Sequence, residues 1–288
     1  MAPPQILLLV GLGLAAGVVA GLLGIGGGSL FGPLLLFYFS TVGVGNAAIS
    51  KLTVGSSLLC TFVVGTASAY YRYRAGELSP RVARRVGLCA AVAVVATTQL
   101  VTTQPWYNRT VFQIVLGTLL VVVGARMVRG DASSSALGEE ASPDEKAASG
   151  KDDDRCPWPL LAGVGTGAGI ISPAAGVGGG VVLVPTYHRL LGLPINRASG
   201  TSSGTIILIS LVGVVSYAAS GWGTSGLPGT AVGYVDVVRA ALLAGPSILG
   251  ARLGVWAAGH IPDRILRWAF VTYALSVAGG MFYDVWTR

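Results

Sequence analysis

Long apolar stretches are the feature that most constrains how this chain of 288 residues can fold. A transmembrane helix needs roughly 17 to 25 mostly apolar residues. Eight stretches reach that length, at about 5–38, 46–70, 82–101, 110–128, 158–190, 197–219, 236–257 and 265–285. They lack the alternation of polar and apolar residues that is typical of barrel strands, and only 11% of the residues are charged. We therefore predict an all-α integral membrane protein with about eight transmembrane segments.

A glycine-rich pentapeptide occurs twice, 152 residues apart, as Gly24-Ile25-Gly26-Gly27-Gly28 and as Gly176-Val177-Gly178-Gly179-Gly180. Pro33 follows the first copy and Pro185 the second. Upstream, Leu9, Gly11, Gly13 and Gly17 match Leu161, Gly163, Gly165 and Gly169 at the same spacing. This pattern predicts two repeated four-helix halves. The first transmembrane repeat is expected at 1–130, an acidic flexible linker at 131–156 and the second repeat at 157–288.

The first apolar stretch of each half is too long for one straight span. About 35 residues make roughly 52 Å of helix, whereas the hydrocarbon core is roughly 30 Å thick. We predict that the glycine-rich loops break these helices, with short second helices beginning near Ser29 and near Val181. Main-chain N–H groups and helix N-termini at two such loops, meeting near the midplane, could bind an anion. The alternative is that the glycines only allow close helix packing.

A polar segment follows each loop and is predicted to complete this site. Residues 46–53 align with residues 196–203 at a spacing of 150, and each segment places an Asn and several hydroxyls at the start of a helix. Helix capping is the alternative role for such residues. The candidate binding residues are Gly26, Gly27, Gly28, Ser29, Asn46, Ser50, Lys51, Thr53, Gly178, Gly179, Gly180, Asn196, Thr201 and Ser202.

Three charged residues lie near the ends of predicted spans. The role of one of them, Lys51, is left open, and the other two are interpreted as structural. Lys51 is the only lysine outside the linker. An ionisable group in a span is a functional hypothesis by default, so Lys51 either binds the anion or extends its ammonium to the membrane surface. Asp236 and Arg239 lie at the start of the seventh stretch, and we interpret them as interfacial anchors.

The distribution of charge predicts the orientation. The formal charge of +7 is concentrated in loops between spans, which argues against nucleic acid as a partner. Loops rich in Lys and Arg face the cytoplasm, and the main ones are 71–85 and 129–157. Four crossings in each half would place both termini on that cytoplasmic side. The two halves would then have the same orientation, as a parallel repeat.

The sequence offers no catalytic or metal-binding pattern. Its three cysteines show no metal or redox spacing, and it contains only two histidines. Almost no carboxylates fall inside the predicted spans. A membrane enzyme or assembly factor is therefore disfavoured, and we predict no cofactor and no metal site.

These residues resemble the TauE/SafE family of sulfite exporters, also called the toluene sulfonate uptake permease family. The resemblance rests on the paired glycine loops with Pro33 and Pro185, on the segments around Ala48 and Ala198, and on the Gly-Ala-Arg-Leu-Gly run at 250–254. It covers nearly the full length apart from the linker. Lys51 departs from the small hydroxyl residue that the family pattern would place there, whereas Thr201 keeps it.

The resemblance implies a secondary transporter in the plasma membrane that works without ATP hydrolysis. Its substrates would be small sulfur-containing or organic anions such as sulfite, thiosulfate, sulfonates or sulfoacetate. The family's glycine loops correspond to Gly24, Gly26, Gly27, Gly28, Gly176, Gly178, Gly179 and Gly180 in this chain. The expected mechanism is alternating access between the two halves, and the alternative is an anion channel that uses the same loops as a filter. The expected partners are the anionic substrate, the lipid bilayer and possible further copies of the chain.

Overall fold

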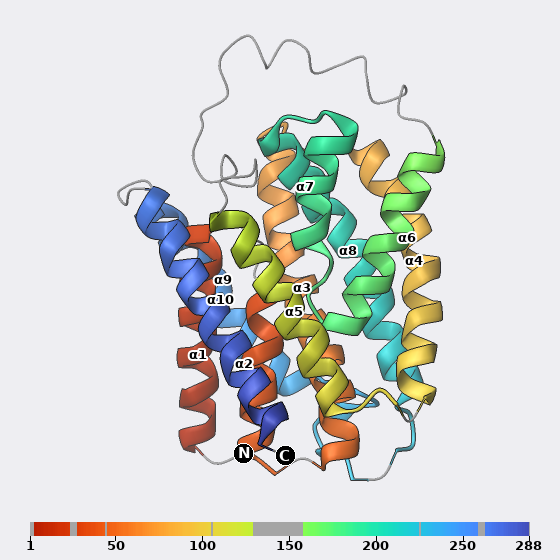
Figure 1. Ribbon diagram of the computed structural model, residues 1–288, viewed down its shortest axis with the longest axis vertical. Coiled ribbons are helices and arrows are strands. Elements are labelled where there is room, and N and C mark those ends of the chain that lie inside the picture. The colour runs from red at the N-terminus through yellow and green to blue at the C-terminus, as the bar shows by residue number, and fades with distance from the viewer. Residues whose placement is uncertain are drawn as a thin grey trace.

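The computed structural model describes residues 3–23, 28–43, 45–104, 106–128, 158–224, 226–258 and 263–287, and helices dominate it (Figure 1). The helices are α1 (Pro3–Leu23), α2 (Gly28–Thr41), α3 (Asn46–Arg74), α4 (Pro80–Thr103), α5 (Arg109–Val128), α6 (Trp158–Ala175), α7 (Gly180–Leu191), α8 (Ile195–Ser220), α9 (Val237–Ala258) and α10 (Asp263–Trp286). Two short antiparallel strands, β1 (Ala231–Val232) and β2 (Val235–Asp236), lie between α8 and α9.

The prediction of an α-helical membrane protein is confirmed. In the described part of the chain, three segments are long and apolar enough to cross a membrane: Ala48–Arg74, Pro80–Thr103 and Arg197–Ser220. They belong to α3, α4 and α8. The total of eight spans stays a prediction.

Both overlong apolar stretches are divided between two helices. The second stretch is broken where α6 ends at Ala175 and α7 begins at Gly180. In the first stretch, α1 ends at Leu23 and α2 begins at Gly28. Residues 24–27 lie outside the described residues, as does the linker predicted at 131–156.

The long helices α3 and α8 pack against each other in opposite directions. Gly200, near the start of α8, lies against Glu77, just beyond the end of α3. Ser203 lies 3.3 Å from Ser68, hydroxyl to hydroxyl, and Gly213 packs against Leu58. Residue numbers therefore increase along α8 in the direction in which they decrease along α3, so the two helices are antiparallel.

Two further helix pairs repeat one packing arrangement. Gly13 and Gly17 of α1 lie against the main chain of α9 at Leu243 and Ser247. Gly165 and Gly169 of α6 lie against the main chain of α4, with the carbonyls of Val86 and Ala90 each 2.5 Å from the place of an added Cβ. Glycines four residues apart allow such close contact between helix backbones. The first helix of each half therefore packs on a helix of the other half.

These directions contradict the predicted parallel repeat. α3 and α8, which occupy corresponding places in the two halves, run antiparallel, so the second half is inverted relative to the first. The prediction was wrong because it counted each overlong apolar stretch as one crossing. The short α2 and α7 instead return toward the end of the molecule from which α1 and α6 came (Figure 1). Each such pair is called a re-entrant pair below, α1–α2 in the first half and α6–α7 in the second.

The chain ends and the arginine-rich loop lie at opposite ends of the molecule. α1 begins and α10 ends at the lower end in Figure 1, beside the N and C labels, whereas α4 and α6 begin at the upper end. The upper end carries five arginines, at positions 72 and 74 at the end of α3 and at positions 81, 84 and 85 at the start of α4. The termini and these arginines therefore cannot both face the cytoplasm, contrary to the prediction.

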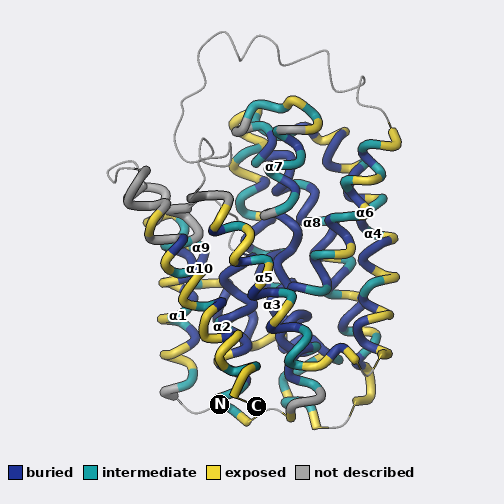
Figure 2. The backbone as a smooth tube through the Cα atoms, viewed as in Figure 1, coloured by how far each residue is buried: buried dark blue, intermediate teal, exposed yellow. Residues whose placement is uncertain are grey.

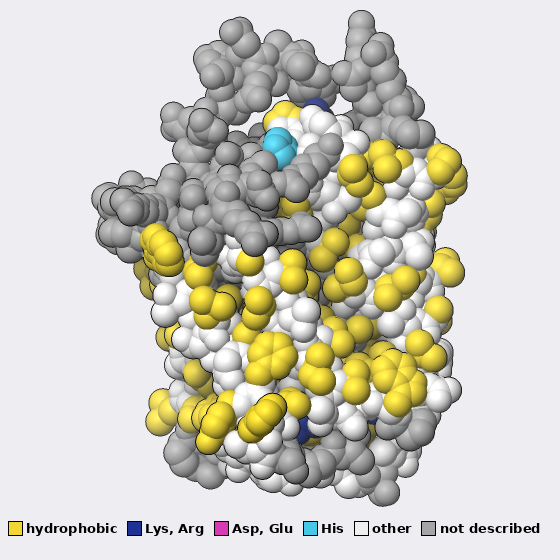
Figure 3. All heavy atoms as spheres, viewed as in Figure 1, with side chains coloured by type: hydrophobic (Ala, Val, Ile, Leu, Met, Phe, Trp, Pro, Cys, Tyr) yellow, Lys and Arg dark blue, Asp and Glu magenta, His cyan; other side chains and the backbone are white. Residues whose placement is uncertain are grey.

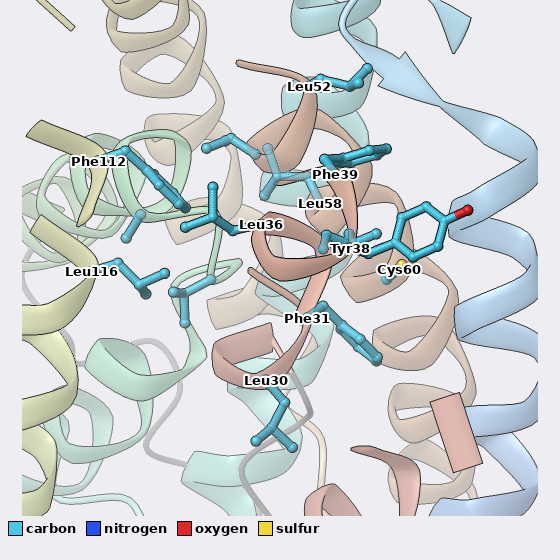
Figure 4. Close-up of a cluster of buried hydrophobic side chains, with 14 of the residues drawn as sticks. Leu30, Phe31, Leu36, Tyr38, Phe39, Leu52, Leu58, Cys60, Phe112 and Leu116 are labelled. Carbon is cyan, nitrogen blue, oxygen red and sulfur yellow. The ribbon is translucent and has the colours of Figure 1, made fainter. Parts of the chain in front are cut away.

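The short helix α2 lies inside the bundle. Ten of its fourteen residues are buried, and a helix that is apolar all round is expected to be buried on every side. Figure 4 shows Phe31, Leu36 and Phe39 of α2 among Leu58 of α3 and Phe112 of α5. These residues belong to the main hydrophobic core, which surrounds α2 at the centre of the burial view (Figure 2).

The outer surface is apolar over much of its height. Hydrophobic side chains spread across the middle of the face shown in Figure 3. Large exposed residues include Leu7, Val92 and Leu249, with exposed fractions of 74%, 74% and 64%. Such a surface is suited to lipid rather than water.

Replacing Gly17 with alanine should lower the stability of the protein. The new Cβ would collide with the main-chain oxygen of Ser247, so α1 would have to shift away from α9, at a cost of about 1–3 kcal/mol. Gly169→Ala, in the matching contact between α6 and α4, should lower the stability in the same way. Gly11→Ala is the control, because nothing lies within 4 Å of its added Cβ. The measurement is the thermal unfolding midpoint in detergent, and equal midpoints for the Gly11 and Gly17 variants would contradict the expectation.

Candidate functional site

The second re-entrant pair turns through a loop that only glycine accommodates easily. Gly176, Gly178 and Gly179 have φ angles of +67°, +72° and +81°. L side chains rarely adopt this region, whereas glycine does so without steric cost. Gly179 directly precedes α7 as its N-cap residue. We call residues 176–179 tip 2.

The carbonyl groups around tip 2 are bonded by hydroxyl groups from three other segments. Ser57 of α3 donates to the Gly176 carbonyl at 2.8 Å, and Tyr217 of α8 donates to the Pro173 carbonyl at 2.8 Å. Tyr107, in the α4–α5 connection, donates to the Ala174 carbonyl. Burial raises the pKa of the Tyr107 phenol above its ordinary value, so this group stays a neutral donor.

In contrast to these carbonyls, most main-chain N–H groups of tip 2 have no hydrogen-bond partner among the described residues. Gly176 donates to the Ser172 carbonyl. Among the described residues, however, the N–H groups of Val177, Gly178 and Gly179 have no hydrogen-bond acceptor. These residues are buried, and a buried N–H without a partner is costly. Together with the N-terminus of α7, they give this point a partial positive charge that suits an anion.

The first re-entrant pair reaches the same place. Gly28, the first residue of α2, lies against the main-chain oxygen of Val177, and its added Cβ would be 3.3 Å from the Thr61 hydroxyl oxygen. Thr61 also contacts Gly178. The two helix N-termini therefore meet beside Thr61, about halfway along α3. Gly24, Gly26 and Gly27, which were expected here, lie outside the described residues.

A buried hydroxyl without a partner lies where the two N-termini meet. Ser29, in the first turn of α2, is 2% exposed. Its hydroxyl oxygen has no hydrogen-bond partner among the described residues. Ser29 is thus, like the unbonded amides of tip 2, a buried polar group without a partner among the described residues. We call the group formed by tip 2, Gly28, Ser29, Ser57 and Thr61 the central site.

The structure does not bring the two predicted polar segments together. Ser50, Lys51 and Thr53 lie near the start of α3, whereas Ser203 lies level with Ser68. Lys51 and Ser68 are separated by 17 residues, or about 25 Å along the helix. One small anion cannot contact both segments at once. The polar segments therefore flank the central site from opposite ends of the α3–α8 pair.

All five predicted hydroxyl side chains are buried, but among the described residues only that of Thr201 has a hydrogen-bond partner. Its hydroxyl oxygen accepts a hydrogen bond from the Ser79 N–H at 3.1 Å, at the start of α4. Ser50, Thr53 and Ser202 are at most 1% exposed and have no side-chain partner among the described residues. The side chains of Asn46 and Asn196 are outside the described part.

The packing also changes the correspondence between α3 and α8. Gly55 lies against the main-chain oxygen of Tyr234, and Ser56 next to it accepts the Asp236 N–H at 2.9 Å. Gly200 and Thr201 make the matching contacts with Glu77 and Ser79. Gly200 thus corresponds to Gly55 and Thr201 to Ser56, at a spacing of 145 residues rather than the predicted 150. In this register Ser57 corresponds to Ser202, so Ser202 is the residue expected to face the first glycine loop.

Ser57 and Thr61 were missing from the predicted site. They lie seven and eleven residues after Ser50, which places all three hydroxyls on one face of α3. This spacing could have identified them from the sequence. What the sequence did not show is that tip 2, from the other half of the chain, packs on this face.

Lys51 has a contact away from the central site. Its ammonium group donates to the carbonyl of Thr102, in the last turn of α4, at 2.6 Å, and lies 5.5 Å from the centre of the Tyr234 ring. Cations near a helix C-terminus stabilise its unpaired carbonyls. Lys51 is also six residues, or about 9 Å, from Ser57 along α3.

Replacing Lys51 with methionine should therefore reduce stability and leave substrate affinity unchanged. Loss of a hydrogen bond from a charged donor should cost about 1.5–3 kcal/mol. Lys51→Arg, which keeps a cationic donor, is the matched control. Thermal unfolding and substrate titration of the same preparations would test this. A folded Lys51→Met variant that binds substrate at least ~10-fold more weakly, or about 1.4 kcal/mol, would show that Lys51 contacts the anion.

Asp236 and Arg239 are buried, so their interpretation as interfacial anchors was wrong. Their exposed fractions are 0% and 7%, and the Arg239 guanidinium forms an ion pair with the Asp236 carboxylate. Thr230 donates to the same carboxylate at 3.0 Å. Arg239 also lies over the rings of Tyr38 and Phe39 of α2. The ion pair lies at the start of α9, and the ring contacts of Arg239 join it to the end of α2. In the described ranges, no group of three His, Cys, Asp or Glu side chains could hold a metal ion.

Comparison with known proteins places the chain in a family. A probable membrane transporter protein of Haemophilus influenzae is 26% identical over 277 residues, which cover 96% of this chain and 98% of the relative. A probable membrane transporter protein of Methanocaldococcus jannaschii is 27% identical over 90% of this chain and 89% of the relative. No solved structure is similar enough to match. The family model described as Sulfite exporter TauE/SafE matches residues 9–281. The chain therefore belongs to the TauE/SafE family.

Proposed function

We propose that this membrane transporter is a secondary transporter that carries a small sulfur-containing or organic anion across the plasma membrane. The observation that carries the proposal is the imbalance at tip 2. Carbonyls there are bonded by Ser57, Tyr107 and Tyr217, whereas three buried main-chain N–H groups have no acceptor among the described residues. An anion would satisfy these donors. The family's description as sulfite exporters supports sulfite as a candidate substrate, and sulfonates, thiosulfate and sulfoacetate are the further candidates that the sequence resemblance implies.

The proposed mechanism is alternating access around the central site. Two bundles of helices would move against each other. Each bundle contains three helices from one half of the sequence and one helix from the other half. α1, α2, α3 and α9 pack together, as do α6, α7, α8 and α4, and the main contact between the two groups is α3 on α8. Rocking of one bundle against the other would open the site to each side in turn, as in transporters with inverted repeats.

The proposed orientation places the arginine-rich end in the cytoplasm. Positive residues near spans favour that side. The end of α3 and the start of α4 together carry five arginines, and α8 and α10 begin at the same end with Arg197, Arg264 and Arg267. At the other end, Arg109 is paired with Asp284 and Arg239 with Asp236. Both chain ends would then lie outside the cell, because they lie opposite the arginine-rich end.

A labelling experiment tests the orientation. Single cysteines would be introduced at Thr287 and at Ser142 in a background without native cysteines, and intact cells would be treated with a membrane-impermeant maleimide. We expect labelling at 287 and none at 142 until the cells are opened. The reverse pattern would overturn the orientation.

A flux experiment tests the transport function. Purified protein in liposomes should exchange labelled sulfite or methanesulfonate with a saturable rate. The same ligands should raise the thermal unfolding midpoint of the protein in detergent, because a ligand that binds only the folded state stabilises it. Unitary currents in a bilayer would show an anion channel instead. A folded protein that gives neither exchange nor a shift would overturn the proposal.

A further inference from the structure

A groove opens on the outer surface of the molecule at the arginine-rich end. It has a volume of about 380 Å³, is open on one side, and is lined by residues of α3, α4, their connection and α8. α3 and α4 both pack on α8, and the place of an added Cβ on Gly204 of α8 is 3.1 Å from Leu78 and 3.2 Å from Ala83. None of the groove residues belongs to the central site.

The groove follows one face of α3 into the membrane. Its residues on α3, at positions 66, 69, 70 and 73, are three or four apart, which places them on the same side of the helix. The membrane-spanning segment Ala48–Arg74 ends one residue beyond Tyr73. Thr66 lies seven residues, or about 10 Å, further inside it. The groove therefore runs from the membrane surface into the hydrocarbon region.

The lining of the groove is mostly apolar. Its residues from the α3–α4 connection, from the start of α4 and from α8 are leucine, proline, alanine, glycine and isoleucine, apart from Arg84. The Thr66 hydroxyl donates to the Phe62 carbonyl of its own helix at 2.7 Å, so it needs no partner in the groove. Such a surface suits a hydrocarbon chain rather than a polar ligand.

A cation and two aromatic rings lie toward the membrane-surface end of the groove. Arg84 is exposed, and no hydrogen bond or ion pair joins its guanidinium to another described residue. A guanidinium binds phosphate oxygens through paired hydrogen bonds. Tyr70 and Tyr73 are 56% and 63% exposed, and tyrosine is enriched where membrane meets water. This end of the groove therefore fits a phosphate group next to an acyl chain.

The surroundings of the groove carry an excess of positive charge. Between residues 71 and 90 the sequence has five arginines and one acid, Glu77, which pairs with Arg72 at 3.1 Å. The net charge of this stretch is therefore +4. Basic residues beside a span attract anionic lipids, so a negatively charged headgroup is favoured over a zwitterionic one.

Two other occupants fit this groove less well. The linker predicted at 131–156 carries acids, but Leu137 is its only large aliphatic side chain, so it offers little to an apolar groove. A second copy of the chain, placed groove to groove, would bring two arginine clusters together, and like charges across an interface oppose association.

We propose that this groove binds one anionic phospholipid. An acyl chain lies along α3 and α8, and the phosphate lies at Arg84. The rings of Tyr70 and Tyr73 cover the chain near the membrane surface. Because α3 belongs to one of the proposed bundles and α4 and α8 belong to the other, the lipid lies at the boundary between them.

Dioleoylphosphatidylglycerol and dioleoylphosphatidylcholine make a matched pair of probes. They share their acyl chains and phosphate and differ in the net charge of the headgroup. Each would be titrated into the purified full-length protein in detergent, and bound lipid would be counted by native mass spectrometry. The wild-type protein should bind phosphatidylglycerol at least ~5-fold more tightly than phosphatidylcholine. Glycerophosphate, which has no acyl chains, should not displace it.

The variant Arg84→Gln should lose this preference for phosphatidylglycerol. Arg252→Gln is the matched control, because Arg252 is also exposed but lies on α9, outside the groove. The preference should persist in that variant. Thr66→Trp, which places a ring in the groove, should weaken the binding of both lipids. The unfolding midpoint of each variant checks that it is folded.

Equal binding of the two lipids by the wild-type protein, or equal losses in Arg84→Gln and Arg252→Gln, would overturn the proposal. Displacement by glycerophosphate would indicate a phosphate site without a lipid. Phosphatidylglycerol binding that appears only after the acids of the linker are replaced by asparagine would make the linker the occupant. A changed oligomeric state in Thr66→Trp would make it a second copy of the chain. None of these measurements involves an anion at tip 2, so the proposed transport function is tested separately.

Discussion

Replacing Gly178 with alanine should abolish anion transport. The residue has a φ of +72°, and the new Cβ would collide with the Thr61 side chain. The left-handed conformation alone costs a non-glycine residue roughly 1–2 kcal/mol, and the collision adds to it. Tip 2 would have to move away from α3, which would misalign the N–H groups of Val177 and Gly178. We expect the rate of labelled substrate exchange in liposomes to fall at least ~10-fold, or about 1.4 kcal/mol.

Gly192→Ala is the matched control for this change. Gly192 has a φ of +63°, but nothing lies within 4 Å of its added Cβ, and it follows α7 at the end away from tip 2. It therefore carries a similar backbone strain without the collision at the site. Exchange should continue in this variant. Wild-type exchange by Gly178→Ala, or equal losses in the two variants, would contradict the role assigned to tip 2.

Replacing Asp236 with asparagine should cause the largest loss of stability. The change leaves the Arg239 guanidinium, only 7% exposed, without a compensating charge. Removing one partner of a buried ion pair typically costs about 3–5 kcal/mol. The side-chain oxygen of asparagine can still accept the main-chain N–H of Arg239, as the carboxylate does at 3.0 Å, so the change removes the charge and keeps the helix cap. We expect a much lower unfolding midpoint in detergent and a reduced yield of folded protein.

The double variant Asp236→Asn with Arg239→Gln separates charge from packing. Replacing both charges removes the unpaired cation, and neutral replacement of a buried pair is often tolerated. The double variant should therefore be more stable than Asp236→Asn alone. If both variants unfold at the same temperature, the loss comes from side-chain packing rather than from the uncompensated charge.

The inverted arrangement explains why the glycine repeat extends upstream of the loops. Gly13 and Gly17 contact α9, and Gly165 and Gly169 contact α4. The matching glycines thus serve helix packing, whereas Gly176, Gly178 and Gly179 serve a loop with positive φ angles. The packing interpretation is therefore confirmed for the upstream glycines, whereas the anion-binding interpretation of the loop glycines stays a prediction.

The sequence by itself determined the membrane class, the helical fold and the two helix breaks. These features follow from local properties, because hydrophobic length decides what can cross a bilayer and runs of glycine interrupt helices. The central site was partly predicted in the same way. Gly28, Ser29 and Gly178 were identified because they lie at or beside a helix break, and breaks can be located without knowing which helices are neighbours.

Only the tertiary structure decided the direction of the halves, the side chains that lie beside tip 2 and the contacts of Lys51. Ser57 and Thr61 join the site because tip 2, more than a hundred residues later in the chain, packs against their face of α3. The Lys51 ammonium lies away from tip 2 because it donates to the Thr102 carbonyl at the end of α4. Hydropathy and spacing describe one segment at a time. Helix direction, register and hydrogen-bond partners depend instead on close contacts between segments far apart in sequence.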